Sequence, residues 1–188
     1  MFQLSPLCAY QGAMSILPTF AEQLSRARSD LRVGLPVRLT SALGDVLAAP
    51  AESIGADRFD ALRSIGPPVL AITAWRAQTL KARAYDGDLA RIVVPKDATP
   101  EWISSVADPA DDLATPMKGP FVCAREGPAD LHRAAILLVK SAHLLPAAVV
   151  VSIHKERETP GRHSGRLDRA CGVQNCQSRR FDSQGKGN

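Results

Sequence analysis

The sequence TFAEQLSRARSDLRVGLPVRLTSALGDVLAA, residues 19–49, predicts a capped helix followed at once by two short strands. Thr19 and Glu22 have the spacing of a capping box, in which the hydroxyl accepts from a backbone N–H while the carboxylate reaches back. Apolar residues then recur at helical spacing until Gly34 and Pro36, which are typical of a helix end. A helix that leads directly into strands indicates a domain with both kinds of element.

Strands and helices continue to alternate outward from this region. This order predicts an α/β domain with at least some parallel pairing of strands. The basic side chains of the helix at 74–83 are expected to face solvent. The predicted strands are 36–40, 45–49, 69–73, 91–94 and 147–151, with a short one at 121–124, and the further helices are 56–65, 74–83, one from residue 100 and one from 129 to 144.

The net charge of +4 is unevenly distributed along the chain. Residues 152–188 hold eight Lys and Arg but four Asp and Glu, while residues 1–151 hold fifteen of each. The last segment is also poor in apolar residues, so it cannot bury enough surface to offset the entropy of ordering. We therefore expect a flexible segment at 1–18, one α/β domain at 19–151 and a basic, disordered tail at 152–188.

Location and partners follow from composition by exclusion. No apolar run approaches the roughly 18 residues of a membrane-spanning helix, and residues 1–15 lack the basic region of a secretory signal. We expect a cytoplasmic protein with no membrane partner and with four cysteines as free thiols. Nucleic-acid binding is not expected from the domain, because its charges balance and the basic surplus lies in the tail.

One possible metal site falls in the tail. Cys171 and Cys176, with His154 and His163 before them, are residue types that bind zinc. The two histidines are separated by eight residues, which is wider than the usual spacing in structural zinc sites. Disorder is the preferred interpretation of this segment.

The domain itself offers no catalytic constellation. His132 and His143 fall on one helix about 16 Å apart, which is too far to share a metal or a proton. Asp111 and Asp112 could contact magnesium, but a solvated acidic turn is the simpler interpretation. Neither glycine-rich phosphate motif nor a Gly-x-Ser-x-Gly run is present. We predict no catalytic, cofactor-binding or metal-binding residue, and no cofactor.

Four stretches resemble a known family. They are RARSDLRVGLPVRLT (26–40), GDVLAAPAE (44–52), VLAITAWRAQTLKARA (69–84) and residues 131–151. They resemble the N-terminal domain of some bacterial GTP cyclohydrolase II proteins of riboflavin synthesis. That domain is itself similar to 3,4-dihydroxy-2-butanone 4-phosphate synthase. The resemblance implies a single mixed-sheet α/β domain with flanking helices.

The two regions that carry the synthase chemistry are both altered here. The acidic loop D-D-x-x-R-x-x-E-G-D-L is reduced to Gly44 and Asp45, so little remains to hold a divalent cation. In the G-H-T-E-A region, Leu131 stands at the His position and Arg133 at the Glu position, while Ala134 keeps the Ala. His132 lies one residue late and points about 100° away around the helix.

We therefore interpret the chain as a catalytically silent synthase-like domain that acts as a scaffold or regulatory module. We expect it to be truncated before the cyclohydrolase domain, whose C-x(10)-C-x-C cysteines it lacks, by a frame change or similar event. The expected partner is a second copy or the missing cyclohydrolase domain, and an exposed apolar patch should favour self-association. The alternatives are a residual synthase-type enzyme using His132, Asp111 and Asp112, or a non-functional product whose tail binds nucleic acid weakly.

Overall fold

The computed structural model describes residues 18–42, 44–153 and 175–177. The predicted segment at 1–18 therefore falls outside the described residues, apart from residue 18. Of the predicted tail, residues 152 and 153 belong to a strand and residues 175–177 form another, while the remainder lies outside them.

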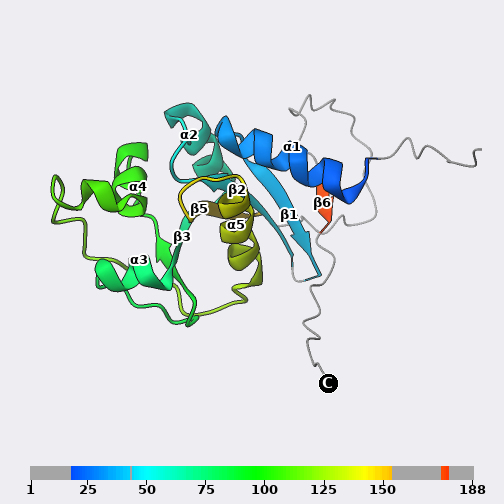
Figure 1. Cartoon of the computed structure of the whole chain (residues 1–188). Coiled ribbons are helices and arrows are strands. Elements are labelled where there is room, and N and C mark those ends of the chain that lie inside the picture. The colour runs from blue at the N-terminus through cyan, green and yellow to red at the C-terminus, as the bar shows by residue number, and fades with distance from the viewer. Residues whose placement is uncertain (1–17, 43, 154–174, 178–188) are drawn as a thin grey trace, which may run out of the picture.

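The first helix and hairpin form as the sequence predicts (Figure 1). Helix α1 spans Phe20–Arg32, and Thr19 and Glu22 complete its capping box. Strand β1 (Val37–Ser41) then pairs antiparallel with β2 (Gly44–Pro50). Gly34 ends the helix with a φ of +74°, a conformation that glycine adopts without a steric penalty.

The other elements lie close to their predicted ranges, with two exceptions. Helix α3 is shorter than predicted, and the strand predicted at 121–124 is reduced to a single bridge between Ile92 and Cys123. The elements after the hairpin are α2 (Ala56–Ile65), β3 (Val69–Thr73), α3 (Ala74–Thr79), β4 (Leu89–Val93), α4 (Pro100–Ala107), the 3-10 helix η1 (Pro109–Asp112), α5 (Asp130–Ser141), β5 (Ala147–Ile153) and β6 (Asn175–Gln177).

The strands form one six-stranded sheet in the order β4-β3-β5-β2-β1-β6. The first five of these are antiparallel to their neighbours, and the parallel pairing expected from the alternation of elements is confined to β1 and β6. The connection through α3 shows the reason. This connection starts β4 at the same end of the sheet where β3 finishes, so that Thr73 pairs with Leu89 and the two strands run antiparallel. Parallel neighbours would need a connection that crosses the sheet from one end to the other.

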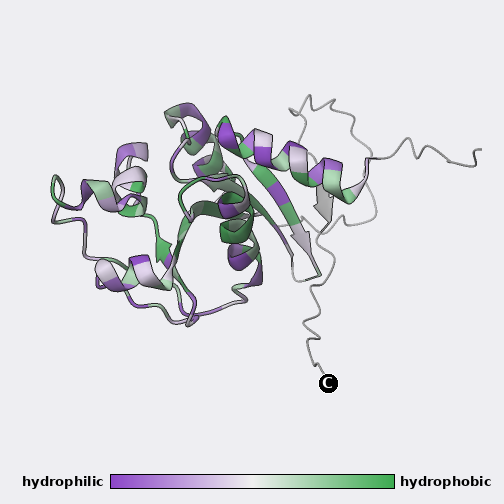
Figure 2. Ribbon diagram, in the orientation of Figure 1, coloured by the Kyte–Doolittle hydropathy of each residue, from purple (hydrophilic) through white to green (hydrophobic). Residues whose placement is uncertain are grey.

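Helices cover both faces of the sheet, so the central strands are buried on both sides. Along β2, Leu47 and Ala49 pack in one apolar cluster with residues of α2, α3 and α4, while Val46 and Ala48 pack in the other with α1 and α5. This division follows from the alternation of side chains along a strand. Figure 2 shows the strands as largely hydrophobic and the outer faces of the helices as more polar.

Candidate functional site

The two regions that the resemblance marks as catalytic come together in one pocket. The pocket has a volume of about 360 Å³ and lies between the β1–β2 hairpin and the start of α5. Gly44 and Asp45 line it from the hairpin, and Leu131 and His132 line it from the helix. We call it the hairpin pocket. Residues almost ninety positions apart in the sequence thus meet in one pocket.

Asp45, the one carboxylate kept from the acidic loop, is buried at 5% exposure. Its carboxylate forms an ion pair with Arg38 on the neighbouring strand β1. The pair sits across the hairpin, where Asp45 is opposite Thr40 in the register. A cation entering the pocket would therefore compete with an arginine of the chain itself for this carboxylate.

Arg133, at the position of the family's glutamate, is held by two carboxylates. Its Nε and Nη2 donate to the two oxygens of Asp88 over 2.6 and 2.7 Å, and its Nη1 donates to Asp130 over 3.1 Å. The hydrogen bonds from Arg133 keep the pKa of Asp88 below its usual value, and the same pair raises the pKa of Arg133. Leu131 packs against the apolar cluster beneath α5. Neither side chain can act as a ligand or a base.

His132 is the one histidine in the hairpin pocket, and its surroundings keep it neutral. Burial, followed by the nearby Arg91 guanidinium, lowers the pKa of His132 to about 4, and the charge of Asp86 opposes them. Arg91 is buried at 4% exposure and donates to both oxygens of Asp86 over 2.7 and 3.0 Å. Nδ1 of His132 is buried and has no hydrogen-bond partner among the described residues. The imidazole is therefore uncharged near pH 7.

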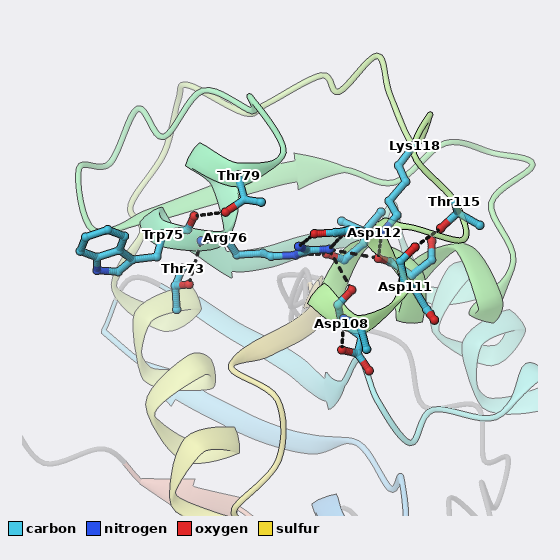
Figure 3. A network of polar contacts seen from close by, with 12 residues as sticks. Thr73, Trp75, Arg76, Thr79, Asp108, Asp111, Asp112, Thr115 and Lys118 are labelled. Carbon is cyan, nitrogen blue, oxygen red and sulfur yellow. Dashed lines mark hydrogen bonds and ion pairs between the residues drawn. The ribbon is translucent and has the colours of Figure 1, made fainter.

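A second polar cluster surrounds Arg76, and it corrects the expectation that the basic residues of this helix face solvent. Arg76 is buried at 8% exposure, while its neighbour Trp75 is 82% exposed and points the other way (Figure 3). Its guanidinium donates to both oxygens of Asp112 over 2.6 and 2.7 Å. Lys118 donates to the same carboxylate over 2.6 Å. The remaining donors of Arg76 reach three carbonyls at the end of α4 and beyond, those of Ser105, Val106 and Asp108.

This cluster engages both oxygens of the Asp112 carboxylate. Hydrogen bonds from Arg76 and then from Lys118 hold the pKa of Asp112 far below its usual value. Two cations share one carboxylate, so a magnesium ion would meet net positive charge there. The backbone oxygen of Asp111 accepts from Thr115, which fixes the loop after η1.

The proposed enzyme set of His132, Asp111 and Asp112 is not brought together. His132 lines the hairpin pocket, while Asp112 lines a larger pocket of about 1110 Å³ beside α3. His143 lies just beyond the opposite end of α5 from His132. The helix on which both histidines were predicted thus ends before His143.

Metal-binding groups are sparse in the described part of the chain. Within residues 18–42, 44–153 and 175–177, no three His, Cys, Asp or Glu side chains gather closely enough to hold an ion. Cys123 is a free thiol. Cys171, His154 and His163 lie outside the described residues, and Cys176 falls in β6, whose side chains are not described.

Sequence reasoning missed the three arginines that organise these sites, Arg38, Arg76 and Arg91. Each pairs with an aspartate, and only Arg91 has its partner as close as five residues away. Arg38 and Asp45 could have been found by folding the predicted hairpin and noting that they lie close across it. For Arg76, whose partner is 36 residues away, the sequence holds no such signal.

No protein-family model matches the sequence. The chain is 32% identical over 130 residues to the GTP cyclohydrolase-2 of Azospirillum brasilense. The match covers 68% of this chain and 34% of that protein, so the chain spans about a third of the length of its relative.

Solved structures of 3,4-dihydroxy-2-butanone 4-phosphate synthase share the fold. The enzyme of Candida albicans superposes with a TM-score of 0.50 at 16% identity, covering 72% of this chain and 81% of that one. A cation-free form of the synthase gives a TM-score of 0.51 at 17% identity, covering 74% and 79%. The resemblance to a synthase-like domain of GTP cyclohydrolase II, expected from the sequence, is confirmed in both sequence and fold.

Proposed function

We propose that this chain is a catalytically silent, synthase-like module of riboflavin synthesis, acting as a scaffold or regulatory partner rather than as an enzyme. One observation carries the proposal. In and beside the hairpin pocket, the positions that the resemblance marks as ligands and bases are held in ion pairs within the chain or replaced by an apolar residue. Asp45 pairs with Arg38, Arg133 pairs with Asp88, and the half-buried Leu131 packs against the core.

The contrast with a metal-binding relative supports this proposal. One solved synthase of this fold, with a TM-score of 0.50 at 17% identity, is a complex with two magnesium ions. A divalent cation of that kind needs several oxygen ligands. The hairpin pocket offers the carboxylates of Asp45, Glu126 and Asp130, of which Asp45 and Asp130 already face arginines of the chain.

The activity assay separates the two enzymatic alternatives from a silent module. Purified protein is offered ribulose 5-phosphate with magnesium, and separately GTP with zinc, beside an active synthase and an active cyclohydrolase as positive controls. We expect no turnover of either compound. Turnover of ribulose 5-phosphate that is lost in His132→Ala would contradict the proposal by showing synthase activity. Turnover of GTP would contradict it by showing cyclohydrolase activity.

The partner of such a module is a second copy of the chain or a cyclohydrolase domain. Several large apolar side chains are exposed, among them Leu113 at 96%, Met117 at 93% and Leu137 at 60%. A contiguous apolar patch is typical of an interaction surface, so these side chains are the candidate contacts with a partner. Size-exclusion chromatography with light scattering, with and without an added cyclohydrolase domain, should show a dimer or a complex. A monomer under both conditions would contradict the scaffold role.

No described helix is long and apolar enough to cross a membrane.

A further inference from the structure

The larger of the two pockets has a composition that the proposed function does not use. It has a volume of about 1110 Å³ and lies between the end of α3 and residues 115–125. We call it the α3 pocket. It shares no lining residue with the hairpin pocket, and its charged lining consists of one carboxylate, Asp112, and four cations, Lys81, Arg83, Lys118 and Arg125.

The charge of this lining is positive even after its internal pairing. Asp112 is already bound by Arg76 and Lys118, so it cannot neutralise the other cations. Lys118 uses two of its three protons on Asp112 and on the carbonyl of Ser105, which leaves one for a ligand. Lys81 and Arg83 have no ion pair within the described part of the chain.

The remaining lining supplies an apolar wall. Phe121 and Leu80 are partly buried, pack against the core and line the pocket. Tyr85 also lines it, and the guanidinium of Arg125 lies 4.7 Å above the centre of its ring. A cavity that combines cations with aromatic and aliphatic side chains suits a ligand with both an anionic and an apolar portion.

The conformation of Lys81 adds an independent observation. Helices α1, α3 and α5 all end in a Schellman motif, in which the two residues after the cap donate back to carbonyls of the last turn. The left-handed position of this motif is occupied by Gly34 in α1, by Lys81 (φ +55°) in α3 and by His143 (φ +61°) in α5. A side chain at this position is unfavourable relative to glycine. Lys81 and His143 both adopt this unfavourable left-handed conformation, but only Lys81 lines the α3 pocket.

We propose that the α3 pocket binds a small molecule that carries a phosphate ester on a planar, apolar group. The phosphate would lie against Lys118, Lys81 and Arg83, because ammonium and guanidinium groups are the preferred donors to phosphate oxygens. The planar group would lie against Phe121 and Leu80. This inference does not depend on the catalytic silence of the hairpin pocket.

The test uses phenyl phosphate as the probe, followed by amide chemical shifts of the full chain. We expect saturable shifts at residues lining the α3 pocket, and weaker binding as salt is raised. Phenol, which lacks the phosphate, and glycerol 3-phosphate, which lacks the ring, should each bind more weakly. Equal binding of glycerol 3-phosphate would overturn the role of the apolar wall, and the absence of saturable shifts would overturn the site.

Matched variants separate binding from folding. Lys81→Gly should weaken phenyl phosphate binding about tenfold, the size expected for one charged hydrogen bond, while raising the Tm by about 4 °C. His143→Gly relieves the same conformation away from the pocket, so it should raise the Tm without changing binding. Arg83→Gln should weaken binding, whereas Lys140→Gln, which removes an exposed charge on α5, should not. Wild-type affinity in both Lys81→Gly and Arg83→Gln would overturn the proposal.

Discussion

Replacing Arg76 with lysine tests whether the buried network holds the loop after α4. Lysine keeps the positive charge, but it has three donors on a compact head and cannot reproduce the fork of five hydrogen bonds made by the guanidinium. The carbonyls of Val106 and Asp108 would lose the only side-chain donor that the structure gives them. Asp112 would keep Lys118.

The expected cost follows from those lost partners. A buried acceptor left without a hydrogen bond costs about 1–3 kcal/mol, so two of them predict a loss of about 2–6 kcal/mol in the free energy of unfolding. That is a large share of the roughly 5–15 kcal/mol of an ordinary domain. Urea denaturation at pH 7 measures it, with Arg26→Lys on the exposed face of α1 as a control expected within about 0.5 kcal/mol of the wild type. A value for Arg76→Lys as small as that of the control would refute the reasoning.

Three further predictions concern charge and backbone. The pKa of Asp112 is lowered in the folded state by hydrogen bonds from Arg76 and Lys118, so its stabilisation is present above about pH 4 and is lost at lower pH. Asp112→Asn should therefore be less stable than the wild type at pH 7, with the difference in unfolding free energy shrinking toward pH 2; a constant difference would contradict this. Because burial lowers the folded pKa of His132 to about 4 against roughly 6.5 when unfolded, the wild type should lose stability as pH falls from 6.5 to 4. His132→Leu should remove that dependence, and an imidazole resonance titrating near 6.5 would count against it. Gly34→Ala should be strongly destabilising, since its Cβ would lie 2.1 Å from the backbone oxygen of Ser53, whereas Gly55→Ala meets nothing within 4 Å and should be tolerated in thermal unfolding.

The elements could be predicted where local chemistry determines them. The capping box of Thr19, the apolar run at 69–73 and the Gly-Pro-Pro after residue 65 each specify a boundary through neighbouring residues, and the structure confirms them. The pairing of strands could not be predicted in the same way, because it depends on how far a connection travels across the sheet. The short α3 was read as a longer helix, and the left-handed Lys81 that ends it has none of the usual sequence signal of a glycine.

The same distinction applies to the sites. The resemblance pointed to Gly44, Asp45 and the start of α5, which the structure brings to one pocket. It did not reveal what those residues do now, since Arg38 and Asp88 acquire their roles through contacts across a hairpin and between distant elements. The burial of Arg76 was missed for a related reason, as its partner Asp112 lies 36 residues away at the end of η1, where no sequence pattern marks it.

The positions of these ion pairs separate the altered residues from the core that holds the fold. The apolar clusters rest on alternating residues of β2, β3 and β5, whereas the altered positions lie at the end of the hairpin and the first turns of α5. Arginine in place of a carboxylate would leave an unpaired charge near the pocket unless a partner were present, and Asp88 provides one. Arg38, Arg91 and Arg133 are thus each matched by a carboxylate of the chain. The altered positions therefore leave no uncompensated arginine charge near the pocket, which is what the proposed silent module needs in order to be stable.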